Sequence, residues 1–312
     1  MEEVNMNLSI ICTDPAEHIG KKLAAEYGFS VIFPQKNREN KRLFPDGEVY
    51  TKIPEIIDLQ GEIVVLHSGA PDPNEGLVEL EQILARLKNL RKKLTLKLWK
   101  FKVSLRILKF RPVVFFLYFP YGKQDRVFVP GEINSAEELI KKLVKYYGVK
   151  HIYFIDVHFS ERSWLKKYPI TNISAIDLLT QAALREYQDL LFLTTDMGGQ
   201  KRTGLKGTLK RRLDSFTTEI QSTEDFQQSV RGKVIGAVDD LIETGGTMVN
   251  FYQECKKAGA REAVALLTHG VMESGIKRIA GTYAKLYLTN TINRPEANLD
   301  ITGLVAGIMS KI

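Results

Sequence analysis

Residues Val234–Met248 read VIGAVDDLIETGGTM, and this stretch carries the strongest structural signal of the chain. Its apolar beginning predicts a buried strand that leads into two adjacent carboxylates, Asp239 and Asp240. The segment Thr244–Thr247 then predicts a turn that opens a helix near Met248. Glycines let the backbone approach a phosphate closely, and a helix N-terminus offers unpaired N–H groups to it. We therefore expect a cradle for a phosphorylated sugar, with the two carboxylates at the sugar hydroxyls.

Strand and helix signals alternate along the rest of the chain, which predicts an α/β fold with mainly parallel sheets. A capping box at Ser135 and Glu138 introduces one of the helices. The expected strands are Leu8–Thr13, Ile63–His67, Val113–Phe119, His151–His158, Leu190–Thr195, Lys233–Val238, Ala263–Thr268 and Leu286–Thr289. The expected helices are Ala16–Tyr27, Leu139–Tyr147, Ala175–Tyr187, Gly246–Lys257 and Gly275–Ala284. Two sheets accommodate this many strands better than one, so we expect two domains, residues 1–160 and 161–312.

Composition limits the class of protein. Hydrophobic residues make up 44% of the chain and charged residues 26%, which indicates a globular protein with a core rather than a disordered chain. The two cysteines, Cys12 and Cys255, argue against a disulfide framework and favour a reducing cytoplasm. The N-terminal residues lack the pattern of a signal peptide, and the apolar run at residues 113–119 is too short to cross a bilayer. We expect a cytoplasmic protein with no transmembrane segment.

The formal net charge of +7 is concentrated in one segment, because no acidic residue lies between Glu81 and Asp125. Leucines at three- and four-residue steps favour a basic amphipathic helix over residues 88–111. A strand is the alternative, because apolar residues alternate with polar ones from Lys100 to Ile107. Such an element can bind an anionic membrane surface or a nucleic acid, or it can be a solvated face of its own protein.

Five segments, taken in chain order, resemble the motifs of one enzyme family. VDDLIETGGT is similar to the PRPP-binding motif of type I phosphoribosyltransferases and of ribose-phosphate pyrophosphokinases, the PRPP synthetases. The other four segments resemble the synthetase motifs RFPDGE, YARQD, DLH and PDxGGxKR; they are Arg42–Glu48, Tyr121–Asp125, Asp156–His158 and Thr195–Arg202. The resemblance implies two tandem phosphoribosyltransferase-like domains, with the basic segment of about residues 88–111 as an insertion in the first.

The resemblance also implies roles for single residues on the nucleotide side of the reaction. His158 and Asp196 would contact Mg²⁺-ATP, a role that imidazole and carboxylate groups can fill. Gly198 and Gly199 would bring backbone N–H groups to the pyrophosphate. The residues beside ATP, the first three usually reaching across a subunit interface, would be Phe44, Asp46, Glu48, Lys123 and Gln124.

The implied reaction transfers pyrophosphate from Mg²⁺-ATP to the C1 hydroxyl of ribose 5-phosphate, giving PRPP and AMP, and Mg²⁺ is the implied cofactor. It depends on charge stabilisation more than on covalent chemistry. Lys210 and Arg212 would be the loop cations that act at the transition state, together with His158. Ribose 5-phosphate would be held by Asp239, Asp240, Thr244, Gly245, Gly246 and Thr247. Family members form dimers and hexamers, so a homo-oligomer is implied.

Two alternatives use the same cradle. A phosphoribosyltransferase would consume PRPP, although the PDGE motif and the tandem architecture argue against it. A regulatory subunit of the synthetase type would bind nucleotides without turnover. Lys123, which stands where the family motif has Arg, and the short stretch before Lys210 favour that reading.

Overall fold

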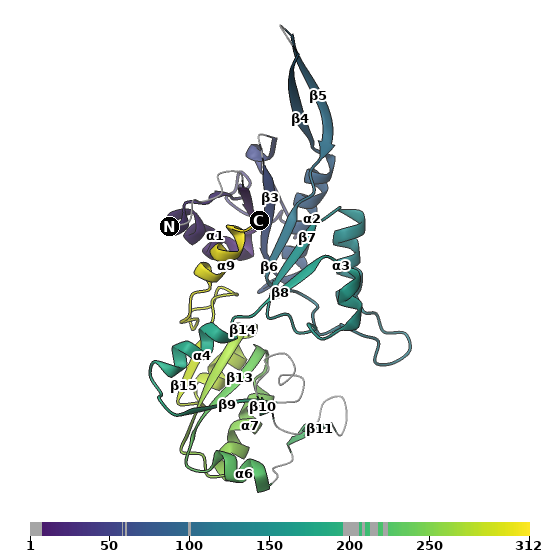
Figure 1. The fold of residues 1–312 in the computed structure, drawn as a ribbon. Coiled ribbons are helices and arrows are strands. Elements are labelled where there is room, and N and C mark those ends of the chain that lie inside the picture. The colour runs from purple at the N-terminus through teal and green to yellow at the C-terminus, as the bar shows by residue number, and fades with distance from the viewer. Residues whose placement is uncertain are drawn as a thin grey trace. The chain divides into compact units, whose positions relative to one another are not determined.

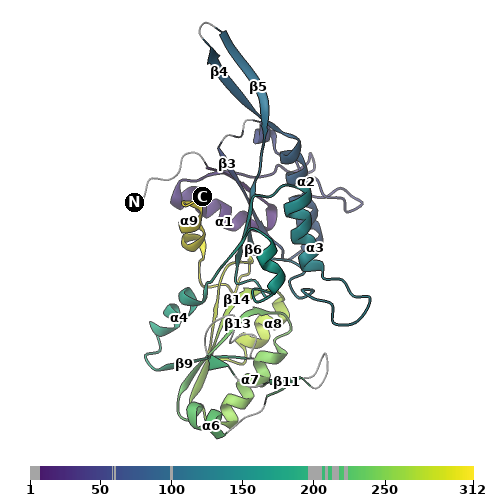
Figure 2. The same ribbon diagram turned by 45° about the vertical axis from the view of Figure 1, so that its right-hand side comes forward.

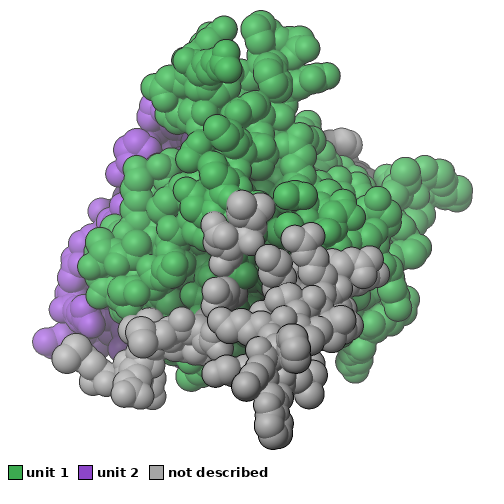
Figure 3. Space-filling model, turned by 90° about the horizontal axis from the view of Figure 1, so that it is seen from above, with its two compact units in different colours: residues 1–154, 162–172, 302–312 green, residues 155–161, 173–301 purple. Residues whose placement is uncertain are grey.

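The structure is a computed structural model that describes residues 8–57, 59, 61–98, 101–195, 206–207, 210–212, 218–220 and 224–312. These residues fall into two compact units, which Figure 3 colours separately. The first unit takes its described residues from 1–154, 162–172 and 302–312, and the second takes them from 155–161 and 173–301. The chain therefore passes between the units several times, which differs from the single boundary near residue 160 that the sequence led us to expect.

The first unit is built on a six-stranded sheet with the order β2-β1-β3-β6-β7-β8 (Figure 1). The pairings of β1 with β2 and β3, of β3 with β6, and of β6 with β7 are parallel. The central strands β3 and β6 are almost wholly buried, as strands covered on both faces are, and they read as continuous apolar runs. The strands are β1 (Leu8–Cys12), β2 (Ser30–Ile32), β3 (Glu62–Ser68), β6 (Val113–Tyr118), β7 (His151–Ile155) and β8 (Ile170–Ile173).

The helices of the first unit come from its N-terminal part and from the C-terminal end of the chain. α1 packs against α9, although the two are far apart in sequence, and this contact assigns the C-terminal helix to the first unit. The α-helices are α1 (Glu17–Tyr27), α2 (Pro73–Asn89), α3 (Ser135–Lys141) and α9 (Thr302–Met309). A π-helical stretch, η3 (Lys142–Tyr146), follows α3, and the 3-10 helices are η1 (Asp14–Ala16), η2 (Pro54–Ile57) and η4 (Ser163–Lys167).

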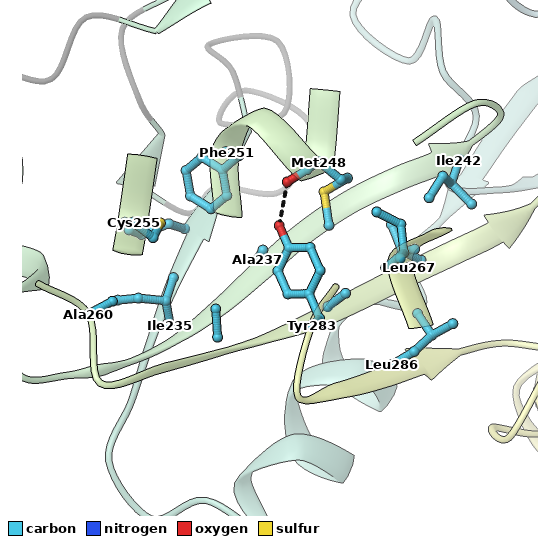
Figure 4. Close-up of a cluster of buried hydrophobic side chains, with 14 of the residues drawn as sticks. Ile235, Ala237, Ile242, Met248, Phe251, Cys255, Ala260, Leu267, Tyr283 and Leu286 are labelled. Atoms are coloured by element: carbon cyan, nitrogen blue, oxygen red, sulfur yellow. Dashed lines mark hydrogen bonds between the residues drawn. The ribbon is translucent and has the colours of Figure 1, made fainter. Parts of the chain in front are cut away.

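The second unit has a five-stranded sheet with the order β10-β9-β13-β14-β15, and all its pairings are parallel. Phe251 and Cys255 of α7 pack on one group of core residues that includes Ile235 and Leu267 of the sheet (Figure 4). The buried Tyr283 donates a hydrogen bond from its hydroxyl to the carbonyl of Met248 (2.7 Å). A second group, which includes Ile176, Leu179 and Val264, joins α4 to the sheet.

The elements of the second unit have the following bounds. The strands are β9 (Leu190–Thr194), β10 (Lys206–Gly207), β13 (Val234–Ile242), β14 (Glu262–Gly270) and β15 (Lys285–Leu288). The helices are α4 (Ile176–Leu184), α6 (Glu224–Val230), α7 (Gly246–Lys257) and α8 (Glu273–Ala280). A separate antiparallel pair is formed by β11 (Lys210–Arg212) and β12 (Thr218–Ile220).

The basic segment is where the sequence-based expectation of a helix was wrong. The helix ends at Asn89, and the chain continues as the antiparallel strands β4 (Arg91–Leu98) and β5 (Phe101–Lys109). The alternation of apolar and polar residues along both strands fits this pairing, although leucine rather than β-branched residues supplies most of the apolar positions. The intervening dipeptide Trp99-Lys100 contains no Gly, Pro, Asn or Asp, so the sequence lacked the usual hairpin signal.

Two local expectations also need correction. The N-cap of α3 is Asn134, whose side chain accepts a hydrogen bond from the Glu137 amide (3.1 Å). Ser135 instead donates its hydroxyl to Gln124 (2.5 Å), so it does not form the predicted capping box. Strand β13 extends to Ile242 rather than ending at Val238, because its pairing with β14 continues along its length.

Candidate active site

The predicted phosphate cradle lies between the end of β13 and the start of α7. Gly245 has φ +76°, a left-handed conformation that glycine adopts without strain, and it is the N-cap residue of α7. The first turn of a helix has N–H groups without intrahelical partners, and these suit an anion. A cavity of about 200 Å³ opens at this turn and is lined by His158, Asp239, Asp240, Leu241, Ile242, Glu243, Thr244, Gly245, Gly246, Thr247 and Met248. The structure therefore brings together His158 and all six residues expected to hold ribose 5-phosphate.

Helix α8 packs against the turn of the cradle through Gly275 and Arg278. A Cβ atom on Gly275 would lie 1.7 Å from the carbonyl oxygen of Glu243, so only glycine allows this approach. Arg278 donates a hydrogen bond through Nη1 to the carbonyl of Thr244 (3.1 Å). These two residues hold the turn in place, and no local signal in the sequence indicates either of them, because the turn lies about thirty residues earlier.

The two carboxylates of the cradle have different partners. Asp240 is almost buried, with 6% of its side chain exposed, and its Oδ2 lies 2.7 Å from Nδ1 of His158. Asp239 accepts hydrogen bonds from Thr195 Oγ1 (2.9 Å) and from the amide of Asp240 (3.0 Å). Adjacent strand residues point to opposite faces of a sheet, which explains why the two side chains diverge. The contact with Asp240 fixes the orientation of the His158 ring, of which about a third is exposed.

A buried carboxylate, Asp156, fixes the turn that presents His158. Asp156 Oδ2 accepts hydrogen bonds from the amide of Ala175 (3.0 Å) and from Oγ1 of Thr268 (2.7 Å). Its backbone has φ +36°, an unfavourable value for a residue with a Cβ, and such strain is often found at functional sites. Burial raises the pKa of Asp156, and these hydrogen bonds oppose the rise. The sequence placed His158 at the end of a strand, whereas β7 ends at Ile155 and His158 lies in the turn beyond it.

Behind this turn lies the buried His269 of β14. Its Nε2 donates to the carbonyl of Ile155 (3.1 Å), and its Nδ1 lies 2.9 Å from Oγ1 of Thr291. Burial lowers the pKa of His269 to about 4, so the ring is neutral at physiological pH. Both bonds lie within the second unit, where they hold the backbone at Ile155, so His269 is a positioning residue that sequence analysis missed.

In the first unit, Phe44, Asp46 and Glu48 lie on a short hairpin. Phe44 and Glu48 are joined by a backbone hydrogen bond (2.8 Å), and Asp46 Oδ1 accepts the amide of Glu48 (3.1 Å). Phe44 is 43% exposed, and its ring forms a T-shaped pair with the ring of Tyr50, with 5.6 Å between ring centroids. A cavity of about 440 Å³ beside it is lined by Phe44, Val49, Tyr50, Thr51, Ile53, Ile56, Gln82, Ile83 and Arg86. Phe44 thus lines this cavity, whereas Asp46 and Glu48 do not.

Arg42 anchors this hairpin to the body of the first unit. Its Nη2 lies 3.0 Å from Asp14 Oδ1, and its Nη1 lies 3.7 Å from Glu79 Oε1. Glu79 is buried on α2 and also accepts the amide of Asp14 (3.0 Å). Burial raises the pKa of Glu79 to about 7, although Arg42 and the Asp14 amide act to lower it. The Arg42 carbonyl accepts the amide of Tyr50 (2.8 Å), which closes the hairpin at its base.

Lys123 and Gln124 are both exposed and belong to the same turn of the first unit. Tyr121 begins this turn with φ +58°, and its hydroxyl donates a short hydrogen bond to Asn74. Gln124 is held by the hydroxyl of Ser135. Asp125 is buried and bonded to Nε of Arg162 (2.6 Å), so it belongs to the scaffold of the turn.

The remaining predicted site residues are only partly covered by the structure. Asp196, Gly198 and Gly199 lie outside the described residues. Lys210 and Arg212 occupy β11, where the register pairs them with Ile220 and Thr218 of β12. Within the part of the chain that is described, no group of three or more His, Cys, Asp or Glu side chains could hold a metal ion. Mg²⁺ commonly takes one or two carboxylates together with substrate phosphates, and the carboxylates that line the cavity beside His158 are ligands of that kind.

Comparison with known proteins finds relatives over most of the chain. A Methanopyrus kandleri ribose-phosphate pyrophosphokinase is 26% identical over 312 residues, covering 95% of this chain and 97% of the relative. The enzyme of the same name from Thermococcus kodakarensis is 32% identical over 196 residues, covering 59% of this chain and 68% of the relative. The Pyrococcus furiosus enzyme is 29% identical over 289 residues, covering 88% and 93%. No protein-family model matches the chain.

One solved structure has a similar fold over nearly the whole length. The phosphoribosylpyrophosphate synthetase of Mycobacterium smegmatis superposes with a TM-score of 0.75 and 21% identity, covering 97% of each chain. This likeness confirms the α/β fold with two mostly parallel sheets. None of the helices in the described residues combines the length and the apolar character needed to cross a membrane.

Proposed function

Since this chain belongs to the ribose-phosphate pyrophosphokinase family of enzymes, we propose that it transfers the β,γ-pyrophosphoryl group of Mg²⁺-ATP to the C1 hydroxyl of ribose 5-phosphate. The products are PRPP and AMP, which feed nucleotide biosynthesis. The observation that carries the proposal is the 200 Å³ cavity, because it combines a helix N-terminus, two carboxylates and an oriented imidazole. The helix N-terminus suits the 5-phosphate, a carboxylate suits the ribose hydroxyls, and the imidazole suits Mg²⁺-ATP.

The sugar phosphate is the substrate of the cradle. The 5-phosphate binds at the amide groups that begin α7, with the hydroxyls of Thr244 and Thr247 as further donors. Asp239 accepts hydrogen bonds from the ribose hydroxyls, since one carboxylate has about four acceptor positions. Asp240 acts chiefly on His158, which it orients from 2.7 Å away.

The nucleotide is held by residues of several of the family motifs. Phe44 offers an exposed aromatic face to the adenine, and Asp46 and Glu48 lie on the same hairpin. His158, with Asp196, would hold Mg²⁺, which neutralises charge on the triphosphate when it is bound. Lys210 and Arg212 stabilise the charge that is redistributed as the pyrophosphoryl group moves, and Gly198 and Gly199 present amide groups to it.

A homo-oligomer, a dimer or a hexamer, is part of the proposal. Residues of the loop between β6 and α3 support it, because Val127, Phe128, Val129 and Ile133 are each more than half exposed. An apolar cluster of this kind is a common mark of a protein–protein contact. Light scattering on the purified protein measures the assembly directly, and a monomer at micromolar concentration contradicts it. Two free, buried cysteines also fit the reducing cytoplasm expected for such an enzyme.

The test of the reaction is to incubate the purified chain with ATP, Mg²⁺ and ribose 5-phosphate and to quantify AMP and PRPP. Equal amounts of the two products support the proposal. His158→Ala should abolish most of the turnover, whereas the matched variant His151→Ala, at a histidine that bonds Thr171 in the first unit, should not. ATP binding without AMP formation identifies the regulatory alternative, and consumption of PRPP with a nucleobase identifies a phosphoribosyltransferase.

A further inference from the structure

The basic hairpin β4–β5 projects from the rest of the first unit, and the views in Figures 1 and 2 agree on this. Its two strands pair with each other as a separate two-stranded sheet. An isolated two-stranded hairpin is at best marginally stable in water, so something beyond its own hydrogen bonds is needed to stabilise it.

The register of the hairpin separates its residues into two faces. Leu94 pairs with Leu105, Leu96 with Val103, and Leu98 with Phe101. Residues two apart in a strand share a face, as do residues directly opposite each other. These six apolar residues therefore occupy the register positions of one face. The other face holds the pairs Lys93–Arg106, Thr95–Ser104 and Lys97–Lys102.

The polar face places like charges opposite each other. Lys97 is paired with Lys102, and Lys93 with Arg106, an arrangement that destabilises a sheet unless anions compensate it. The sequence supplies no such anion locally, since no acidic residue lies between Glu81 and Asp125. The partner of this hairpin must therefore bring negative charge and also cover an apolar face.

Three partners differ in how well they meet both requirements. A second copy of the hairpin would cover the apolar face but would bring the same cations together. A nucleic acid would neutralise the cations but would leave six apolar residues in water. An anionic bilayer does both, because its headgroups carry the charge and its acyl boundary accepts the apolar face.

We propose that the β4–β5 hairpin is a docking element for anionic membrane surfaces, with its apolar face at the acyl boundary and its cations among the headgroups. Trp99, between the strands in sequence, is a residue type enriched at such interfaces. The hairpin lies on the membrane rather than crossing it, and the enzyme is recruited reversibly. This inference does not depend on the reaction proposed above.

The experiment is flotation of the full-length protein with vesicles of phosphatidylcholine, with and without phosphatidylserine. The protein should bind only the anionic vesicles and should dissociate when salt rises from about 0.1 M to about 1 M, which shortens the Debye length from about 10 Å to about 3 Å. The fourfold variant Lys93→Gln, Lys97→Gln, Lys102→Gln, Arg106→Gln should lose binding on the order of a hundredfold, because each cation contributes near an anionic surface.

The control also loses four positive charges, through glutamine substitutions of the exposed residues Lys145, Lys166, Lys233 and Lys311. It should bind like the wild type. A second variant, Leu96→Thr with Val103→Thr, keeps the β propensity and the charge, and it should also weaken vesicle binding. A cooperative thermal unfolding transition with the midpoint of the wild type shows that the body of each variant is folded.

Several outcomes overturn the proposal. One is the absence of binding to anionic vesicles at low salt. Another is an equal loss of vesicle binding in the control variant and in the hairpin variant. Salt-sensitive binding to RNA that survives the Leu96→Thr, Val103→Thr change, with no vesicle binding, assigns the hairpin to nucleic acid instead.

Discussion

Two hairpins of the first unit differ in whether their cations have acidic partners within the protein. In the hairpin of residues 42–50, the one structural cation is Arg42, and two acids of the body, Asp14 and Glu79, face it. In β4–β5, the register pairs Lys97 with Lys102 and Lys93 with Arg106, and the segment contains no acidic residue. The difference teaches that a cation's role follows from where its counter-charge comes from. A cation that is paired with an acid of the same protein anchors local structure. A cation without such an acid is available to bind an external anion.

The anchored hairpin should respond most strongly to substitution. Above pH 7, where Glu79 is ionised, Arg42→Met leaves a buried carboxylate without its cation, and breaking a buried pair costs about 3 kcal/mol or more. We expect the free energy of unfolding to fall by about that amount, and KM for ATP to rise because Phe44 is no longer held. Urea unfolding and steady-state kinetics measure the two effects. A loss below about 0.5 kcal/mol, as for an exposed surface pair, would break the comparison.

The short strand β11 offers a third case, in which the expected counter-charge is the substrate. Lys210→Ala should lower kcat about a hundredfold, since a cation that acts on charge developing in the transition state contributes on that order. ATP affinity should change far less, and Arg212→Ala should act in the same direction. Turnover that survives both substitutions removes these cations from the mechanism. The substrate is then not their counter-charge, and β11, like β4–β5, would need another anion.

The buried acid of the anchored hairpin predicts a pH dependence. The pKa of Glu79 is raised from 4.5 to about 7 in the folded protein, mainly by burial, so the folded state binds the proton more tightly than the unfolded state. Its contribution to stability is complete below pH 4.5 and is lost as pH rises through about 7, at a slope on the order of 1 kcal/mol per pH unit. Unfolding measured from pH 5 to 8 should show this slope in the wild type, after subtraction of the Glu79→Gln profile. Identical slopes in the two proteins contradict the raised pKa.

The smallest expected effect concerns the like-charge pairs of β4–β5. Lys97→Glu places a carboxylate opposite Lys102 and should stabilise the hairpin by about 0.5 kcal/mol, the usual size of a cross-strand pair. Slower amide hydrogen exchange in the two strands at low salt is the expected observation. The same variant should bind anionic vesicles more weakly, so stability and binding move in opposite directions. Unchanged or faster exchange shows that the two lysines do not repel each other.

Local sequence was sufficient for much of the fold. Helix α7 has the bounds Gly246–Lys257 that the sequence predicts, because the glycine turn and the helical periodicity are contained in one short stretch. The alternation of strand and helix correctly predicts two mostly parallel sheets. Local sequence was not sufficient for the basic segment, where leucine spacing fits both periods and only strand pairing decides between them.

The candidate site divides in the same way. The sequence by itself determined that glycines, threonines and two carboxylates follow one strand, because all of them lie within one short stretch, and this is the basis of the predicted cradle. Only the tertiary structure decided that Asp240 orients His158, that Asp156 and His269 fix the turn before it, and that Gly275 and Arg278 support the cradle. Asp240 and His158 are 82 positions apart in the chain. The physical reason is that propensity and turn chemistry act over a few residues, whereas a contact between distant segments exists only once the folded chain has brought them together.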